Sequence, residues 1–249
     1  MRDLCRPLLT ASADLLFPRR CPVCDRPVQP YGGLICKECR DRPVHIEDAS
    51  EFGVFCRKCG RPLRSPESAA DGRCAGCRGT RHVFLRGTAV FTYASVRDSL
   101  YRFKYEGRAE YADYYSGEMA GKLAETFRPD EAQLIVPVPL DKGREKRRGY
   151  NQAGLLAEGI SERTGLPFNK NALVRVRPTL PMKSVTAAER RNNLKNAFIA
   201  HSNDVKFKMI VLIDDIYTTG ATMDACAMAC LSAGAAGVSF IALAIGEDA

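Results

Sequence analysis

The sequence lacks a long hydrophobic run. A helix that crosses a membrane needs about 20 consecutive apolar residues, and no segment of the 249 residues approaches that length. Leucines recur at roughly helical spacing within residues 4–16, but polar residues interrupt them, which argues against the hydrophobic core of a signal peptide. We therefore expect a chain that does not span a membrane, is not exported and stays in the cytoplasm.

A second shortage lies in the first third of the chain, where apolar residues are too few to form a hydrophobic core. This third instead holds four C-x-x-C pairs: Cys21 and Cys24, Cys36 and Cys39, Cys56 and Cys59, Cys74 and Cys77. In a reducing cytosol such pairs bind metal more often than they form disulfides. Redox-active pairs would need a thioredoxin-like context, which this sequence lacks.

The four pairs belong to an internal duplication. Cys21-Pro-Val-Cys24-Asp-Arg26-Pro27 is echoed 35 residues later by Cys56-Arg-Lys-Cys59-Gly-Arg61-Pro62, and each copy is followed by a second pair. Two pairs supply the four thiolates of one tetrahedral zinc site, so two structural zinc ions are expected. The duplication favours pairing in sequential order, although spacing alone leaves an interleaved arrangement open. A module held in this way can serve as a scaffold or docking surface.

From about residue 84 the composition becomes that of an α/β domain. Apolar segments rich in β-branched residues alternate with segments of helical spacing, which is typical of a mostly parallel sheet flanked by helices. Strands are expected at residues 84–93, 133–140, 172–176, 208–214 and 238–245, and helices at residues 95–105, 110–127, 152–163 and 223–233. We therefore divide the chain into an N-terminal helix plus double zinc ribbon, residues 1–83, and a sheet domain, residues 84–249. Cys226 and Cys230 are interpreted as packing residues.

The most specific motif follows the strand at residues 208–214 and opens into a helix. It reads Asp214-Asp215-Ile-Tyr-Thr218-Thr219-Gly220-Ala221-Thr222. In open α/β sheets ligands bind at the carboxyl ends of strands, and a helix N-terminus offers free N–H groups to an anion. The loop from Thr218 to Thr222 is thus predicted to hold a phosphate, and the two aspartates to accept from the vicinal hydroxyls of a ribose. The alternative is that Thr219 or Thr222 only caps the helix while the acids are solvated.

This motif resembles the phosphoribosyl-diphosphate-binding motif of the type I phosphoribosyltransferases. The resemblance implies that fold for residues 84–249. It also implies that Asp214 and Asp215 contact the ribose 2′ and 3′ hydroxyls, that the loop holds the 5′-phosphate, and that magnesium accompanies the diphosphate. Over nearly the whole chain, the order of motifs is similar to the ComF family, which is associated with natural competence and import of single-stranded DNA. The motifs are the zinc pairs, Phe103-Lys104-Tyr105, Val136-Pro-Val-Pro-Leu140, Arg147-Arg-Gly-Tyr-Asn-Gln152, Glu189-Arg-Arg-Asn-Asn-Leu194 and the acidic loop.

The same resemblance implies where a diphosphate binds. The family's diphosphate loop corresponds to Pro137, Val138, Pro139 and Leu140. In the basic run that follows, Arg147 and Arg148 are expected to contact phosphate rather than to form a solvated basic face. Residues 179–196 read as a long loop, where Lys183, Arg190 and Arg191 are expected to act as a lid over the diphosphate.

The expected function is that of a ComF-like protein that binds phosphoribosyl diphosphate or a nucleotide phosphate and supports DNA uptake. The alternatives are an active phosphoribosyltransferase with an unknown acceptor, although no segment predicts a nucleobase hood or a general base, and a non-catalytic nucleotide sensor. The formal net charge of +8 favours anionic partners. Single-stranded DNA is therefore an expected partner, with Tyr150 and Tyr217 as candidates for base stacking. Competence proteins are expected partners of the zinc module.

Overall fold

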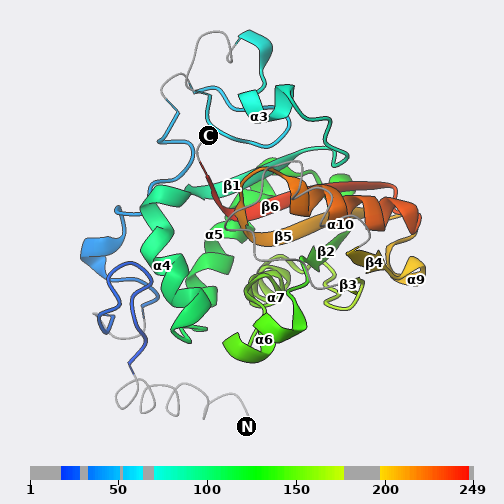
Figure 1. Ribbon diagram of the computed structural model, residues 1–249. Helices are drawn as coiled ribbons and strands as arrows, with labels where there is room; N and C mark the ends of the chain where they lie inside the picture. The colour runs from blue at the N-terminus through cyan, green and yellow to red at the C-terminus, as the bar shows by residue number, and fades with distance from the viewer. Residues whose placement is uncertain (1–17, 29–32, 51–52, 64–69, 177–196, 247–249) are drawn as a thin grey trace.

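The computed structural model describes residues 18–28, 33–50, 53–63, 70–176 and 197–246 (Figure 1). Its centre is a four-stranded sheet with strand order β1-β6-β5-β2, in which every neighbouring pair is parallel. The strands are β1 (Gly87–Thr92), β2 (Leu134–Pro137), β5 (Met209–Tyr217) and β6 (Gly237–Ile245). A second sheet pairs β3 (Leu173–Arg175) antiparallel to β4 (Phe198–Ala200).

Helices cover both faces of the parallel sheet. These helices are α4 (Tyr93–Tyr105), α5 (Tyr111–Thr126), α7 (Gln152–Thr164) and α10 (Ala221–Ser232). Shorter helices are η1 (Lys37–Cys39) and α3 (Ala75–Arg78) in the cysteine-rich module, and η2 (Pro129–Glu131), α6 (Lys142–Arg148) and α9 (Ser202–Val205) in the rest of the chain. Side chains alternate between the faces of a strand. In β5, Val211 and Ile213 pack with α4, α5 and α7, whereas Ile210 and Leu212 pack with α10. Burial on both faces explains why these strands read as continuous apolar runs.

The predicted fold class is confirmed in its main features. A parallel sheet carries helices on its faces and is joined to a cysteine-rich N-terminal module with two four-cysteine groups. Cys226 and Cys230 are fully buried on α10, as expected for packing residues. Among the residues that the structure describes, no helix combines the length and apolar character that crossing a bilayer requires.

Three local features differ from the sequence expectations. The basic run forms the helix α6 because the Asp141 side chain accepts from the Arg144 N–H at 3.3 Å and Gly149, with φ 84°, ends the helix. The strand β5 continues past both aspartates to Tyr217, which stays paired with β6. The short β3 lies outside the main sheet and pairs with β4, whose three residues were too few to be predicted as a strand.

Candidate functional site

The eight paired cysteines form two compact groups. Within each group the sulfurs lie within 4.8 Å of one another, and the groups follow the sequential pairing: Cys21, Cys24, Cys36 and Cys39 in one, Cys56, Cys59, Cys74 and Cys77 in the other. A tetrahedral site with Zn–S bonds of about 2.3 Å places its sulfurs about 3.8 Å apart. The Sγ–Sγ distances of 3.9 Å between Cys24 and Cys36 and 3.7 Å between Cys59 and Cys74 fit that geometry. The donor set therefore fits two structural zinc ions.

The duplicated sequence folds into the same turn twice. The Cys21 N–H donates to Arg26 O and the Cys56 N–H to Arg61 O, both at 2.8 Å. Each turn includes one residue with positive φ, Asp25 in the first ribbon and Gly60 in the second. Burial acts to raise the pKa of Cys24, but hydrogen bonds with Arg26 outweigh it and lower that pKa to about 6.

The two ribbons pack on different parts of the molecule. The cysteines of the second group share a hydrophobic core with one face of the parallel sheet, whereas those of the first form a small cluster of their own. Figure 1 shows the second ribbon, with α3, next to β1, and the first ribbon beside α4. Asp25 links the first ribbon to the sheet domain, because its carboxylate accepts from Arg108 at 2.8 and 2.9 Å and from the Tyr111 hydroxyl at 2.6 Å. The boundary at residues 83 and 84 stays a prediction.

The predicted acid pair lies near the C-terminal end of β5. Asp214 and Asp215 are half-buried, and the Asp215 N–H donates to Asp214 Oδ1 at 2.8 Å. Burial and the neighbouring charge of Asp215 raise the pKa of Asp214 to about 8. On the other carboxylate, Asp215 Oδ2 lies 2.9 Å from the Nζ of Lys104, which comes from α4. Lys104 belongs to the Phe103-Lys104-Tyr105 motif, but nothing in the sequence places this motif beside Asp215.

A small cavity lies within the predicted phosphate loop. Its volume is about 50 Å³ and it is lined by Asp214 and by residues 216–223. A water needs about 10–15 Å³ of such volume, so the cavity has room for a group of several heavy atoms. Gly220 is the N-cap residue of α10 and has the left-handed conformation, φ 78°, and no side chain caps the helix there. Capping by Thr219 or Thr222 is thus not what the structure contains, and Thr218 and Thr219 are exposed.

The predicted diphosphate loop lies beside the acid pair. Strand β2 neighbours β5, with Pro137 paired to Ile213 and the Val138 N–H donating to Ile213 O at 2.9 Å. The segment Pro137 to Leu140 therefore leaves the sheet next to Asp214, at the carboxyl end of β2. The roles predicted for these residues stay predictions.

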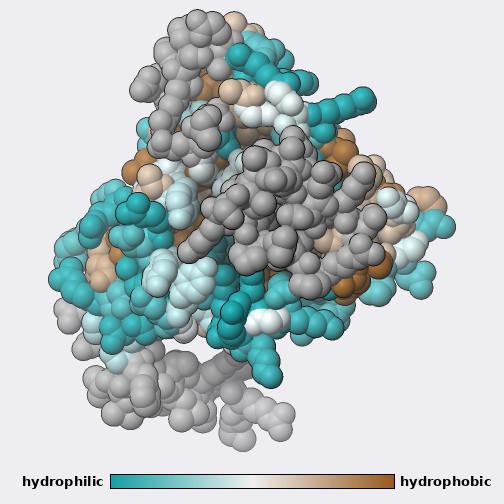
Figure 2. All heavy atoms as spheres, viewed as in Figure 1, coloured by the Kyte–Doolittle hydropathy of each residue, from teal (hydrophilic) through white to brown (hydrophobic). Residues whose placement is uncertain are grey.

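The two predicted arginines of α6 differ in their surroundings. Arg147 is exposed, whereas Arg148 donates to Gln152 Oε1 at 2.8 Å and its guanidinium lies 4.9 Å from the Tyr105 ring centre. Figure 2 shows mostly hydrophilic side chains at the lower edge of the molecule, where Figure 1 places α6. The lid residues Lys183, Arg190 and Arg191 lie outside the described residues.

The prediction that Tyr217 stacks on bases is wrong. Tyr217 is 3% exposed and its ring stacks on Phe240 with a centroid distance of 4.7 Å, because the strand continues and turns this side chain into the core. Tyr150 is half-buried, and its hydroxyl donates to Phe103 O at 2.6 Å.

The sheet, the acid pair with its loop and the two cysteine groups define a class of protein: a double zinc ribbon joined to a parallel α/β domain. The family profile "Double zinc ribbon domain" matches residues 12–78. The chain is 32% identical over 212 residues to "Competence protein ComFC" of Bacillus subtilis, covering 84% of this chain and 83% of that protein. It is 30% identical over 228 residues to "DNA utilization protein YhgH" of Escherichia coli K12, covering 90% and 96%. The chain belongs to the ComF family.

Solved structures that resemble part of the chain are enzymes of phosphoribosyl transfer. One is the glutamine phosphoribosylpyrophosphate amidotransferase of B. subtilis complexed with ADP and GMP, 20% identical with a TM-score of 0.38, covering 56% of this chain and 30% of that one. Another is the hypoxanthine phosphoribosyltransferase of Trypanosoma cruzi, 11% identical with a TM-score of 0.32, covering 56% and 67%.

Proposed function

We propose that this ComF-family protein binds phosphoribosyl diphosphate, or a closely related phosphorylated ribose, and that this binding serves DNA uptake. One observation carries the proposal. The acid pair, a loop with a phosphate-sized cavity and the segment after β2 meet at one edge of the parallel sheet. Parallel α/β sheets bind ligands at this edge.

Each group has a distinct part in the proposed binding. The free N–H groups at the start of α10 and the hydroxyls of Thr218, Thr219 and Thr222 donate to the 5′-phosphate. Asp214 and Asp215 accept from the ribose hydroxyls, and their oxygens are also the ligands that magnesium prefers. A bound magnesium ion would offset charge on the diphosphate. Lys104 holds the carboxylate of Asp215 through the 2.9 Å ion pair and so fixes the direction of one acceptor.

The role in DNA uptake is supported by the relatives and by charge. The two relatives are named a competence protein and a DNA utilization protein. In α6 the side chains of Lys142, Lys146 and Arg147 are exposed, and such a surface attracts a phosphate backbone without reading its sequence. We propose that single-stranded DNA contacts this helix, and that competence proteins contact the zinc ribbons.

Calorimetry with phosphoribosyl diphosphate, with and without magnesium, tests the small-molecule site. Asp214→Ala combined with Asp215→Ala should weaken binding at least tenfold, because several hydrogen bonds to the ribose are lost. A matched control is Asp98→Ala combined with Asp130→Ala, since both aspartates are exposed and lie outside the site. Equal affinity of the wild type and the Asp214/Asp215 variant would contradict the proposal, and release of diphosphate on addition of nucleobases would assign a transferase instead.

A further inference from the structure

Each zinc ribbon has an arginine at the same position, but the two side chains lie in different surroundings. Arg26 and Arg61 occupy the same position of the duplicated unit, two residues after a C-x-x-C pair. Arg26 is exposed and hydrogen-bonds Cys24 of its own ribbon. Arg61 is only 6% exposed. Burial of a guanidinium is costly unless protein groups replace its hydration, so the inward direction of Arg61 calls for a partner.

That partner is the phosphate loop. Arg61 Nη2 donates to the backbone oxygen of Thr218 at 2.7 Å, across 157 positions of the sequence. In a trans peptide, the C=O of one residue and the N–H of the next point in opposite directions. By holding the Thr218 carbonyl, Arg61 therefore sets the direction of the Thr219 N–H, which belongs to the loop around the 50 Å³ cavity.

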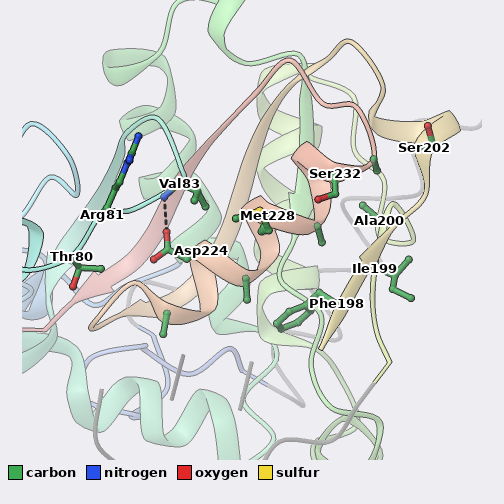
Figure 3. A pocket seen from close by; sticks show the side chains of 14 residues that line it. Thr80, Arg81, Val83, Phe198, Ile199, Ala200, Ser202, Asp224, Met228 and Ser232 are labelled. Atoms are coloured by element: carbon green, nitrogen blue, oxygen red, sulfur yellow. Dashed lines mark hydrogen bonds between the residues drawn. The ribbon is translucent and has the colours of Figure 1, made fainter. Parts of the chain in front are cut away.

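The segment after the last cysteine pair makes a second contact with this loop. The His82 side chain is 1% exposed, and its Nδ1 lies 2.7 Å from Asp224 Oδ2 in the first turn of α10. The other carboxylate oxygen of Asp224 accepts from the Val83 N–H at 2.9 Å, drawn as the dashed line in Figure 3. The His82 ring also lies against Gly220, since a Cβ at that glycine would be only 2.7 Å from Cε1 of the ring. His82 thus packs against the N-cap residue of α10.

The second ribbon is itself fixed to the sheet through its backbone. The Gly87 N–H at the start of β1 donates to Lys58 O at 2.9 Å, and Lys58 Nζ donates to Phe84 O. Gly60 lies so close to β1 that a Cβ would come within 2.7 Å of Gly87 O. In the first ribbon the equivalent residue is Asp25, whose side chain reaches α5 instead. Among the contacts of the described residues, the zinc site of the second ribbon is therefore the one that is connected to the phosphate loop.

We infer that the second zinc ribbon positions the phosphate loop, with Arg61 and His82 as its positioning residues. The loop's affinity for a phosphate then depends on the zinc held by Cys56, Cys59, Cys74 and Cys77 and not on the zinc of the first ribbon. Because a zinc knuckle fixes the backbone from which Arg61 extends, loss of this zinc frees the Thr218 carbonyl. The expected change in phosphate affinity rests on the proposed function. The expected change in how the loop is held does not rest on it.

The test compares Arg61→Met with Arg26→Met, the same change at the equivalent position of the other ribbon. Two quantities are measured on the full chain: affinity for phosphoribosyl diphosphate by calorimetry, and hydrogen–deuterium exchange of the peptide that spans residues 216–224. Arg61→Met should keep two zinc ions, weaken binding roughly tenfold and speed exchange in this peptide, since a charge-assisted hydrogen bond is lost. Arg26→Met should leave both quantities unchanged, even if the first zinc is weakened. Arg61→Lys should restore part of the affinity.

Each outcome decides one of the two proposals. Unchanged affinity and unchanged exchange in Arg61→Met would overturn the inference, as would equal effects of the Arg26 change. If the wild type binds no phosphoribosyl diphosphate, the proposed function fails, and the exchange measurement alone decides the inference. If Arg61→Met loses its second zinc, His82→Asn is used, because it removes the imidazole from Gly220 at a position outside the zinc ligands. Exchange in residues 216–224 that matches the wild type in that variant would also overturn the inference.

Discussion

Asp214 is expected to lower the free energy of unfolding of the native protein when the pH is above about 4. Its pKa is raised to about 8 by burial and by the charge of Asp215, whereas an unfolded aspartate has an ordinary value near 3.9. Between these two pKa values the native carboxyl holds a proton that the unfolded chain has released. The free energy of unfolding therefore falls as the pH rises from about 4 to about 8, and this contribution levels off above pH 8.

The size of the effect follows from the pKa difference. At 1.36 kcal/mol per pH unit, a side chain fully shielded from water would cost about 5–6 kcal/mol at pH 8. Asp214 is only half-buried, so we expect Asp214→Asn to raise the free energy of unfolding by about 1–3 kcal/mol at pH 8, and by less at pH 5. Asparagine keeps the oxygen that accepts from the Asp215 N–H. The same change should weaken phosphoribosyl diphosphate binding, because an amide oxygen is a poorer acceptor than a carboxylate.

Urea unfolding followed by circular dichroism, with zinc in excess and at several pH values, measures this difference. The sequence has no tryptophan, which makes fluorescence the weaker probe. The matched control is Asp98→Asn, which changes an exposed aspartate outside the site and should leave the free energy of unfolding nearly unchanged. A difference between wild type and Asp214→Asn that stays constant from pH 5 to pH 8, or a less stable variant at pH 8, would refute the reasoning.

Three further predictions concern zinc, pH and salt. Metal analysis should find two zinc ions per chain. Cys21→Ser should release one of them with little effect on the sheet domain. Cys56→Ser should release the other and also lower the thermal midpoint of the sheet domain, because the site of Cys56 shares the core of the sheet. Binding of phosphoribosyl diphosphate should strengthen as the pH rises through about 8 and Asp214 ionises, and Lys104→Met should move that midpoint upward; a midpoint that does not move would show that Lys104 has no influence. The affinity for single-stranded DNA, measured by fluorescence anisotropy, should fall steeply as the salt concentration rises. In Arg147→Ala the affinity should fall less steeply, and a slope equal to that of the wild type would place the DNA elsewhere.

The local pattern of the sequence determined much of this protein. Spacing of the cysteines predicted two four-thiolate sites, and apolar periodicity predicted most strands and helices, because both signals depend on near neighbours in the chain. The acid pair and its loop were found in the same way, since strand, acids and glycine follow one another directly. The helix α6 is marked in the sequence in the same way, because aspartate and glycine are common helix boundaries and Asp141 and Gly149 flank it.

Tertiary structure alone decided which distant groups meet. The choice between sequential and interleaved cysteine groups depends on how the ribbons fold, since both fit the spacing. The partner of Asp215 is Lys104, because α4 packs on the face of the sheet from which its side chain reaches the end of β5. The partner of Thr218 is Arg61, although Arg26 holds the equivalent position of the first ribbon and is likewise followed by a proline. Equivalent positions thus hold one exposed and one buried arginine, because among the described residues it is the second ribbon that packs on the sheet, where the Thr218 carbonyl is within reach.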